Sequence, residues 1–175
     1  MIVIRARLEA RAVSPDGRVK QRVTGHNTIT RQGAEQFIKM LLCYPSGTKP
    51  TPKYMSLVNN SGFSAFDVAD TAASTPGWNE TTSYSSGGLR KSMSAPIVEP
   101  IPASGLACHE IEFVMTQIKT VKGIFIVMDT TTSSLDARAK GSTGGFLSAT
   151  APFSAIVPLE IGDSLFVTYK LKGGP

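Results

Sequence analysis

The residues best able to do chemistry in this sequence are few and scattered. The two histidines, His26 and His109, lie in different parts of the chain, and neither belongs to a His-Glu-x-x-His motif or to a zinc-ligand spacing. Cys43 and Cys108 do not form a Cys-x-x-Cys pair, so two free thiols are expected, with a single disulfide as the alternative. These residues predict no metal site.

Motifs for nucleophilic or phosphate chemistry are also missing. The chain has no Gly-x-Ser-x-Gly turn, and the glycine-rich run 141–145 lacks the Lys-Ser/Thr ending of a phosphate-binding loop. Glu110 and Glu112 are two positions apart on one predicted strand, so their side chains lie on the same face, about 7 Å apart. This arrangement could suit a catalytic carboxylate pair. Without an opposing acid, a solvated strand face is the expected role. We predict a protein that is not an enzyme, with no cofactor.

Charge is concentrated near the start of the chain. The net charge is +5, and it is set by the first 31 residues, where seven basic side chains face only Glu9 and Asp16. Six of them define a predicted partner-contact surface: Arg5, Arg7, Arg11, Arg18, Lys20 and Arg22. They could pair with acidic protein surface or with phosphates, or form a solvated face only. Protein carboxylates are favoured over nucleic acid, because arginine pairs with them in a bidentate manner and stacking aromatics are absent here.

Two aromatic residues form a second candidate contact. Trp78 and Tyr84 stand in a long polar segment, where rings of this kind can stack on sugars. The alternative role is to anchor the segment onto the core, and both alternatives are kept at this point.

Length and composition indicate one folded domain over residues 1–175. Hydrophobic residues make up 41% and charged residues 18%, and a chain of 175 residues buries roughly 70% of its unfolded surface. No apolar run reaches the ~18 residues that a membrane span needs, and the first residues do not form a signal peptide. We expect synthesis in a reducing cytoplasm and no membrane partner.

The N-terminal part predicts a hairpin and then a helix. Residues 2–13 alternate, a Ser-Pro-Asp-Gly turn follows, and residues 18–24 return, so 1–26 is a hairpin with Arg18, Lys20 and Arg22 on one face. A helix is predicted at about 31–43, capped by Thr28 or Thr30 and stopped by Pro45. Its apolar positions are Ala34, Phe37, Ile38, Leu41 and Leu42.

The rest of the chain predicts strands joined by two long loops. Strands are expected near 54–58, 89–95, 108–116, 121–128, 146–149, 153–157 and 164–171, and an extended connection at 96–102. The loops are about 60–87 and 130–145, and the first is either functional or ordered by a partner. Short strands at this spacing predict a mainly β fold, an antiparallel β-sandwich or jelly-roll-like domain with one amphipathic helix.

Four segments together resemble small virion proteins of tailed bacteriophages. Residues 26–33 are similar to their N-x-(I/V)-T-x-x-G entry into a helix, and Trp78, Glu80, Tyr84 and Arg90 resemble their W-x-E…Y…R segment. Residues 121–126 resemble a central I-x-G-(I/V) strand, and 162–169 a closing G-D-x-L-x-V-x-Y strand. The chain departs from the pattern at 59–62, where Asn-Asn-Ser-Gly replaces a frequent G-T-G, which puts any one subfamily in doubt.

This resemblance implies a structural role in a virus particle. The expected function is a minor capsid or cement (decoration) protein that stabilises the particle through contacts with major capsid or tail subunits. A tail or tail-fibre component, with possible host-glycan binding through Trp78 and Tyr84, is the alternative. The resemblance further implies location in the virion after synthesis in the host bacterial cytoplasm, and a homo-oligomer within the particle.

Overall fold

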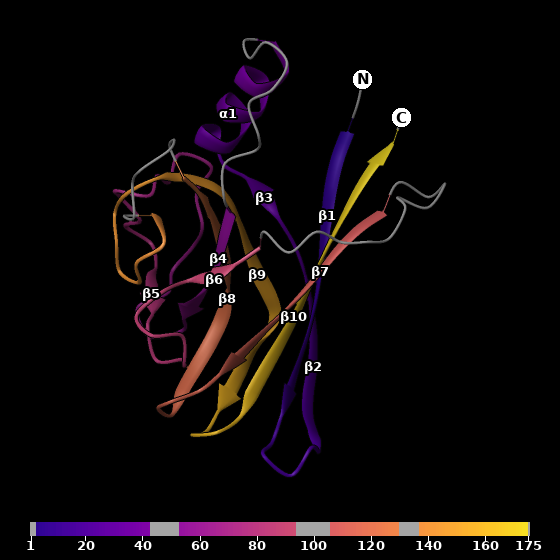
Figure 1. The fold of residues 1–175 in the computed structure, drawn as a ribbon, viewed down its shortest axis with the longest axis vertical. Coiled ribbons are helices and arrows are strands. Elements are labelled where there is room, and N and C mark those ends of the chain that lie inside the picture. Colours follow the sequence, from indigo (N-terminus) through magenta and orange to yellow (C-terminus); the bar gives the residue numbers. More distant parts are fainter. Residues whose placement is uncertain (1–2, 43–52, 94–105, 130–136, 175) are drawn as a thin grey trace.

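The computed structural model describes residues 3–42, 53–93, 106–129 and 137–174. In these ranges the chain is mainly β, and every strand pair is antiparallel (Figure 1). The strands are β1 (Val3–Val13), β2 (Val19–His26), β3 (Thr28–Ile29), β4 (Lys53–Asn59), β5 (Asn79–Thr81), β6 (Lys91–Ser92), β7 (Leu106–Val114), β8 (Lys119–Met128), β9 (Phe146–Leu159) and β10 (Ser164–Gly174). The described helix is α1 (Arg31–Leu42).

The strands form one curled, ten-stranded sheet in the order β5-β4-β8-β9-β2-β1-β10-β7, with β3 on β9 and β6 on β4. The two halves of this sheet join only weakly, because β2 and β9 are paired at Gly25 and Phe153 alone. β1 and β10 run side by side along their whole lengths, from Val3 opposite Gly174 to Val13 opposite Ser164 (Figure 1).

The predicted N-terminal hairpin is present, with an irregularity that the alternation did not predict. Gly17 has a φ of 85°, and its N–H donates to the Ser14 carbonyl oxygen over 2.8 Å. In β2 the register shifts, so that Ala12 pairs with Gln21 but Val13 pairs with Val19. Lys20 is the extra residue of this bulge. The expectation that Lys20 shares a face with Arg22 is therefore wrong.

The main core lies between the two halves of the curled sheet. Inward residues alternate with outward ones on β1 and β10, as the period of a strand requires. The inward set includes Leu8, Ala10 and Ala12 of β1 and Leu165, Val167 and Tyr169 of β10, all buried. They pack with apolar residues of β4, β8 and β9, among them Leu57, Ile124 and Val157.

A second apolar cluster covers the other side of β4 and β8. Tyr54, Val58, Phe125 and Val127 pack there with Trp78 and with loop residues Phe63, Phe66, Ala72 and Ala137. The segment predicted as a loop at 60–87 thus packs on the sheet and contains strand β5. Of the predicted loop 130–145, residues 137–145 are described, and Leu89 bridges to Ala139 within this region.

The helix begins where the sequence predicted. The Thr30 hydroxyl oxygen accepts a hydrogen bond from the Gly33 N–H at 3.1 Å, which caps the first turn. A Cβ at Gly33 would lie 2.1 Å from the Ser148 carbonyl oxygen, so only glycine allows this approach to β9. Ala34 and Ile38 are exposed, whereas the side chains of Phe37, Leu41 and Leu42 lie outside the described set.

Several strand boundaries differ from prediction. The strands expected at 146–149 and 153–157 form the single strand β9. Of the strand expected at 89–95, residues 91–92 form β6, and residues 94–95 lie outside the described residues. The connection at 96–102, Cys43 and the side chains of Cys108 and His109 lie outside the described residues.

Candidate functional site

The candidate site is the outward face of strands β2, β1, β10 and β7, which we call the charged face. Strand register fixes which side chains are neighbours: Arg11 lies opposite Arg22 on one side and Phe166 on the other, and Phe166 lies opposite Glu112. The next row joins Thr24, Glu9, Thr168 and Glu110 in the same order. Arg7 and Lys170 pair in the row beyond. Arginines thus lie on β1 and β2 and two acids on β7, while β1 also has the acid Glu9 and β10 the cation Lys170.

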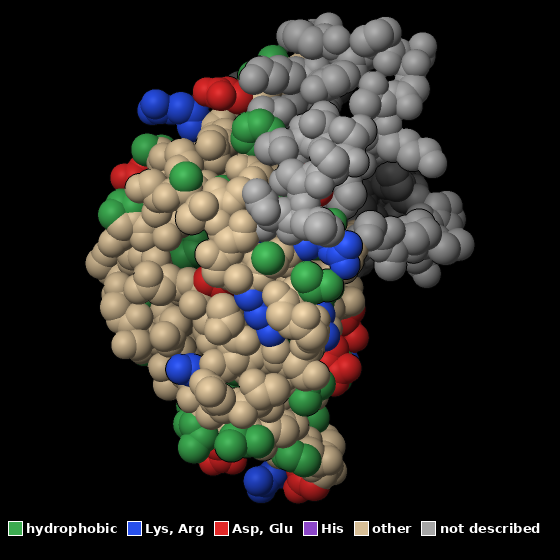
Figure 2. Space-filling view, turned by 60° about the vertical axis from the view of Figure 1, so that its left-hand side comes forward, with side chains coloured by type: hydrophobic (Ala, Val, Ile, Leu, Met, Phe, Trp, Pro, Cys, Tyr) green, Lys and Arg blue, Asp and Glu red, His purple; other side chains and the backbone are tan. Residues whose placement is uncertain are grey.

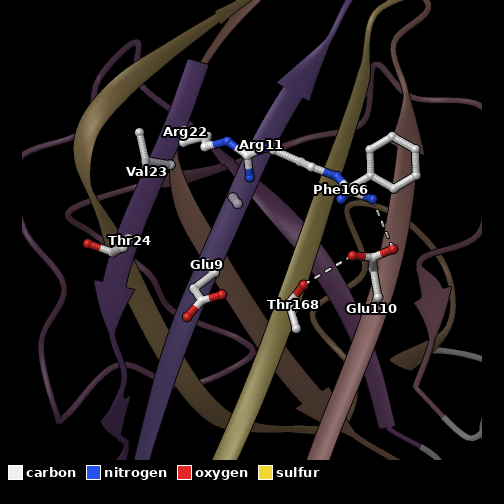
Figure 3. Close-up of a pocket in the computed structure, with 9 residues that line it drawn as sticks. Glu9, Arg11, Arg22, Val23, Thr24, Glu110, Phe166 and Thr168 are labelled. Carbon is white, nitrogen blue, oxygen red and sulfur yellow. Dashed lines mark hydrogen bonds and ion pairs between the residues drawn. The ribbon is translucent and has the colours of Figure 1, made fainter. Parts of the chain in front are cut away.

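Arg11 is held in place by residues of the two strands beyond it. Its guanidinium lies 4.6 Å from the centre of the Phe166 ring, and Nη2 lies 3.2 Å from Oε1 of Glu110 (Figure 3). The Thr168 hydroxyl donates to the other Glu110 oxygen at 3.2 Å. Exposed pairs of this type stabilise a fold by only ~0.2–1 kcal/mol, so their main effect is to orient Arg11.

Glu9 is the acid at the centre of the charged face. The Lys170 ammonium donates to Glu9 Oε2 at 2.8 Å, and Arg7 Nε lies 3.6 Å from Oε1. The hydrogen bond from Lys170 is the main cause that lowers the pKa of Glu9; burial opposes it, and the charges of Lys170 and Arg7 lower the pKa further. Glu9 is therefore ionised at neutral pH, and it neutralises part of the positive charge of β1.

A shallow groove opens in this face. It has a volume of about 220 Å³, and it is lined by Glu9, Ala10, Arg11, Arg22, Val23, Thr24, Glu110, Phe166 and Thr168. Figure 3 shows Arg22 beside Arg11 at one end of the groove, with Glu9 and Thr24 one row further along. Arg22 is exposed, and it makes no hydrogen bond or ion pair with any residue that the structure describes.

Lys20 is placed elsewhere, at the end of the molecule where three turns meet. Its ammonium donates to Asp163 Oδ2 at 2.8 Å and to Glu160 Oε2 at 3.1 Å. These two hydrogen bonds raise the pKa of Lys20. Lys20 therefore ties the β1–β2 hairpin to the β9–β10 turn. Arg18 is exposed in the hairpin turn, and the Arg5 side chain lies outside the described set.

The same end of the molecule exposes aliphatic side chains. Ile118 is 72% exposed and Ile161 66%, and backbone hydrogen bonds between Met115 and residues 162–163 hold their two turns together. Val19 and Ile156 are also exposed there. Figure 2 shows hydrophobic side chains gathered at this lower end beside charged ones. An apolar group of this kind on a surface is typical of a contact region.

The structure places the Trp78 ring in the second core cluster. Trp78 is 3% exposed, and its indole N–H donates to Asp70 Oδ2 at 2.7 Å. Its ring centre lies 5.0 Å from Phe125 and 5.5 Å from Phe66. A sugar stacks on an exposed ring face, which Trp78 does not offer in this structure.

Tyr84 is buried in the main core. It is 2% exposed, its ring meets Phe113 edge to face, and the Lys140 ammonium lies 3.8 Å from its ring centre. Its hydroxyl and that of Ser56 are 2.7 Å apart. Burial raises the pKa of Tyr84 well above its usual range. Both aromatic candidates thus anchor their segment to the sheet.

A buried ion pair connects the same region, and sequence reasoning did not find it. Arg90 donates to both oxygens of Glu80, over 3.1 and 2.8 Å, and the two side chains are 3% and 9% exposed. Glu80 also accepts from the Ser56 hydroxyl at 2.5 Å, and Ser56 contacts Tyr84. Glu80, Tyr84 and Arg90 of the W-x-E…Y…R segment therefore converge on one polar network, whereas Trp78 bonds to Asp70 outside it. The available signal was Glu80, the single acidic residue between Asp70 and Glu99, followed ten positions later by Arg90.

No grouping for a metal ion is present in the described part of the chain. There, no three His, Cys, Asp or Glu side chains come together as metal ligands would. Glu110 bonds to Arg11 and Thr168, and Glu112 accepts from the Ser164 hydroxyl at 2.7 Å, so each acid has a role on the charged face. Within the described ranges, α1 is neither long nor apolar enough to cross a membrane.

Comparison with known proteins adds no relative. No protein-family model matches the chain, and no curated protein or solved structure matches it significantly.

Proposed function

We propose that this chain is a non-enzymatic structural protein of a tailed-bacteriophage particle, a minor capsid or cement protein that stabilises the shell through protein–protein contacts. The observation that carries the proposal is the charged face: an ordered array of both charges on a continuous four-strand surface, with arginines on β1 and β2, acids on β1 and β7, and Lys170 on β10. Such an array suits a complementary protein surface. The motif resemblance to small virion proteins is the reason for proposing a bacteriophage particle as the place where this surface binds.

The buried polar groups support a structural role. The Arg90–Glu80 pair, the Trp78–Asp70 hydrogen bond and the Tyr84–Ser56 contact all join loop segments to the sheet. Glu80, Asp70 and Tyr84 thereby hold their own segments on the sheet. The two halves of the curled sheet, which face each other across one core, support a jelly-roll-like sandwich as the finer fold class.

The proposal includes the setting in which the protein acts. The chain is made in the host bacterial cytoplasm and joins the virion in several copies, because symmetric shells repeat one contact many times. Its partners are major capsid or tail subunits, with no role for a membrane or for nucleic acid.

The test is fractionation of purified particles of the phage that encodes the chain. We expect the wild-type chain in the capsid fraction at a fixed ratio to the major subunit. Arg7→Glu with Arg22→Glu should remove it from particles while the isolated chain stays folded, since both side chains are exposed. A matched control is Arg18→Glu with Arg31→Glu, two exposed arginines away from the charged face, which should incorporate normally. Absence of the wild-type chain from particles would refute the function, and normal incorporation of the first variant would refute the surface.

A further inference from the structure

Arg22 is the side chain on the charged face whose position the fold does not explain. The register sets Arg22 directly opposite Arg11 on the neighbouring strand. Like charges directly opposite each other on paired strands destabilise a sheet. A residue that breaks such a local rule without a compensating contact in the fold points to a function.

Arg11 cannot be the group that awaits a partner. Its guanidinium already lies over the Phe166 ring at 4.6 Å and contacts Glu110 at 3.2 Å. Glu9 is likewise engaged, with Lys170 at 2.8 Å. Among the charged side chains that line the groove, Arg22 alone has no ion-pair partner within the described residues. In Figure 3 no dashed line, which would mark a hydrogen bond or ion pair, reaches Arg22, whereas one joins Arg11 to Glu110.

The size of the groove limits what can bind beside Arg22. Its volume of about 220 Å³ lies below the roughly 300–1,000 Å³ of pockets that enclose a small molecule. A groove of this size on a flat sheet face accommodates one side chain of another protein. The guanidinium offers a planar pair of donors, which matches a carboxylate.

The surroundings of Arg22 argue against a nucleic acid. Binding to a phosphate backbone requires several free cations, and the acids Glu9 and Glu110 line this same groove. Stacking of a base needs an open aromatic face, but Arg11 lies over the ring of Phe166. A single carboxylate requires only one free cation and no open aromatic face.

We infer that the groove receives an aspartate or glutamate side chain of a protein partner, whose carboxylate pairs with the guanidinium of Arg22. This inference deepens the proposed function, because it names the chemistry of the partner at the charged face. Arg11, Phe166 and Glu110 form the rigid wall of the groove, and Arg22 supplies the free charge.

The experiment uses the full isolated chain and two blocked tripeptides, acetyl-Gly-Glu-Gly-amide and acetyl-Gly-Gln-Gly-amide. The readouts are the nitrogen-15 NMR signal of each arginine Nε–H, with the Arg22 signal assigned from Arg22→Lys, and the backbone amide signals of Val23 and Thr24, which line the groove and report binding in the Arg22 variants as well. We expect the glutamate peptide, and not the glutamine peptide, to shift the Arg22 signal in a saturable manner. Arg22→Gln should weaken glutamate-peptide binding by about tenfold or more, the worth of one charge-assisted pair. Arg22→Lys keeps the charge but loses the planar pair of donors, so its affinity for the glutamate peptide should lie between those of the wild type and Arg22→Gln.

Arg18→Gln is the matched control, because it removes the same charge from an exposed site in the hairpin turn. It should change the affinity by less than about twofold, which is under 0.5 kcal/mol. Three results would overturn the inference: equal shifts of Arg18 and Arg22, saturation of Arg22 by an oligothymidylate at lower concentration than by the peptide, or movement of the Arg22 signal with protein concentration alone. The last would identify a second copy of this chain as the occupant.

The outcome is separable from that of the proposed function. If the peptide binds at Arg22 but the chain is absent from particles, the carboxylate site is supported and the virion role is refuted. If the chain is present in particles but the peptide does not bind at Arg22, the virion role is supported and the carboxylate site is refuted.

Discussion

The buried pair of Arg90 and Glu80 gives the sharpest stability prediction. Arg90 donates four hydrogen bonds: two to Glu80, one to the Ala137 carbonyl oxygen at 2.9 Å and one to the Ser142 carbonyl oxygen at 2.8 Å. Arg90→Met removes all four and leaves the Glu80 carboxylate buried without a counter-charge. Breaking one side of a buried pair costs about 3–5 kcal/mol in the free energy of unfolding.

The expected loss lies at the lower end of that range. Glu80 keeps two other donors, the Ser56 hydroxyl at 2.5 Å and the Gly141 N–H at 2.7 Å. We therefore expect about 3 kcal/mol for Arg90→Met. Arg90→Met combined with Glu80→Gln should recover at least about 1 kcal/mol of this, because the double variant leaves no unpaired charge.

The assay is urea unfolding followed by the fluorescence of Trp78, the single tryptophan of the chain. Arg18→Met, at an exposed position, is the control and should change the free energy of unfolding by less than about 0.5 kcal/mol. A loss below about 1 kcal/mol for Arg90→Met would refute the assigned role, since that is the size of an ordinary surface pair. Strict additivity in the double variant would refute the coupling of the two residues.

Three other changes test separate contacts. Trp78→Phe leaves the buried Asp70 oxygen without its indole donor and should cost about 1–3 kcal/mol in urea unfolding followed by circular dichroism. Gly33→Ala would place a Cβ 2.1 Å from the Ser148 carbonyl oxygen, so the backbone must shift, and the melting temperature should fall by several degrees, equivalent to about 1–3 kcal/mol. Burial raises the pKa of Tyr169 to about 12, so its contribution to stability is complete below a pH of ~10 and is lost as pH rises through ~12. Unfolding measured on either side of this window should show a smaller loss for Tyr169→Phe than for the wild type.

Each of these expectations has a contrary outcome. A Trp78→Phe variant as stable as the wild type would show that the Asp67 N–H, which donates to the same Asp70 oxygen at 2.9 Å, satisfies it alone. An unchanged melting temperature for Gly33→Ala would contradict the close approach of α1 to β9. Equal alkaline losses in the wild type and in Tyr169→Phe would show that another group controls stability at high pH.

The sequence predicted those parts of the fold that depend on local alternation. The outward Arg7, Glu9 and Arg11 and the inward Leu165 and Val167 follow from a period of two, and β1 and β10 have this pattern. The helix start at Thr30 was also predictable, because a capping threonine before a helical pattern is a local signal.

Features that depend on distant pairing were not predictable in this way. The bulge that turns Lys20 toward Asp163 is set by the register with β1, and nothing within β2 itself indicates it. The two strands expected before and after Pro152 are one, because β8 pairs along both parts of β9. The position of β10 between β1 and β7 likewise has no local signal.

In the candidate site, too, local features were predictable and features that depend on distant strand pairing were not. The basic character of the first hairpin was visible in the sequence, but its neutralisation was not. Arg11 and Glu110 lie 99 positions apart, and Glu9 and Lys170 lie 161 apart, so the pairing of these charges required the strand order. Among the residues that the structure describes, that order leaves Arg22 without an ion-pair partner in the groove, which composition alone did not reveal.

The adjacency of β1 and β10 also determines how the chain reaches its fold. On one side β1 pairs with β2, the next strand along the chain, but the strand on its other side is made last among the ten described strands. The charged face and half of the main core therefore form only after translation of β10, and the early hairpin has an open edge until then. Sheets closed by contacts of such high contact order fold in milliseconds to seconds rather than microseconds. During that interval the open edge of β1 is the part of the molecule most exposed to mispairing with other chains.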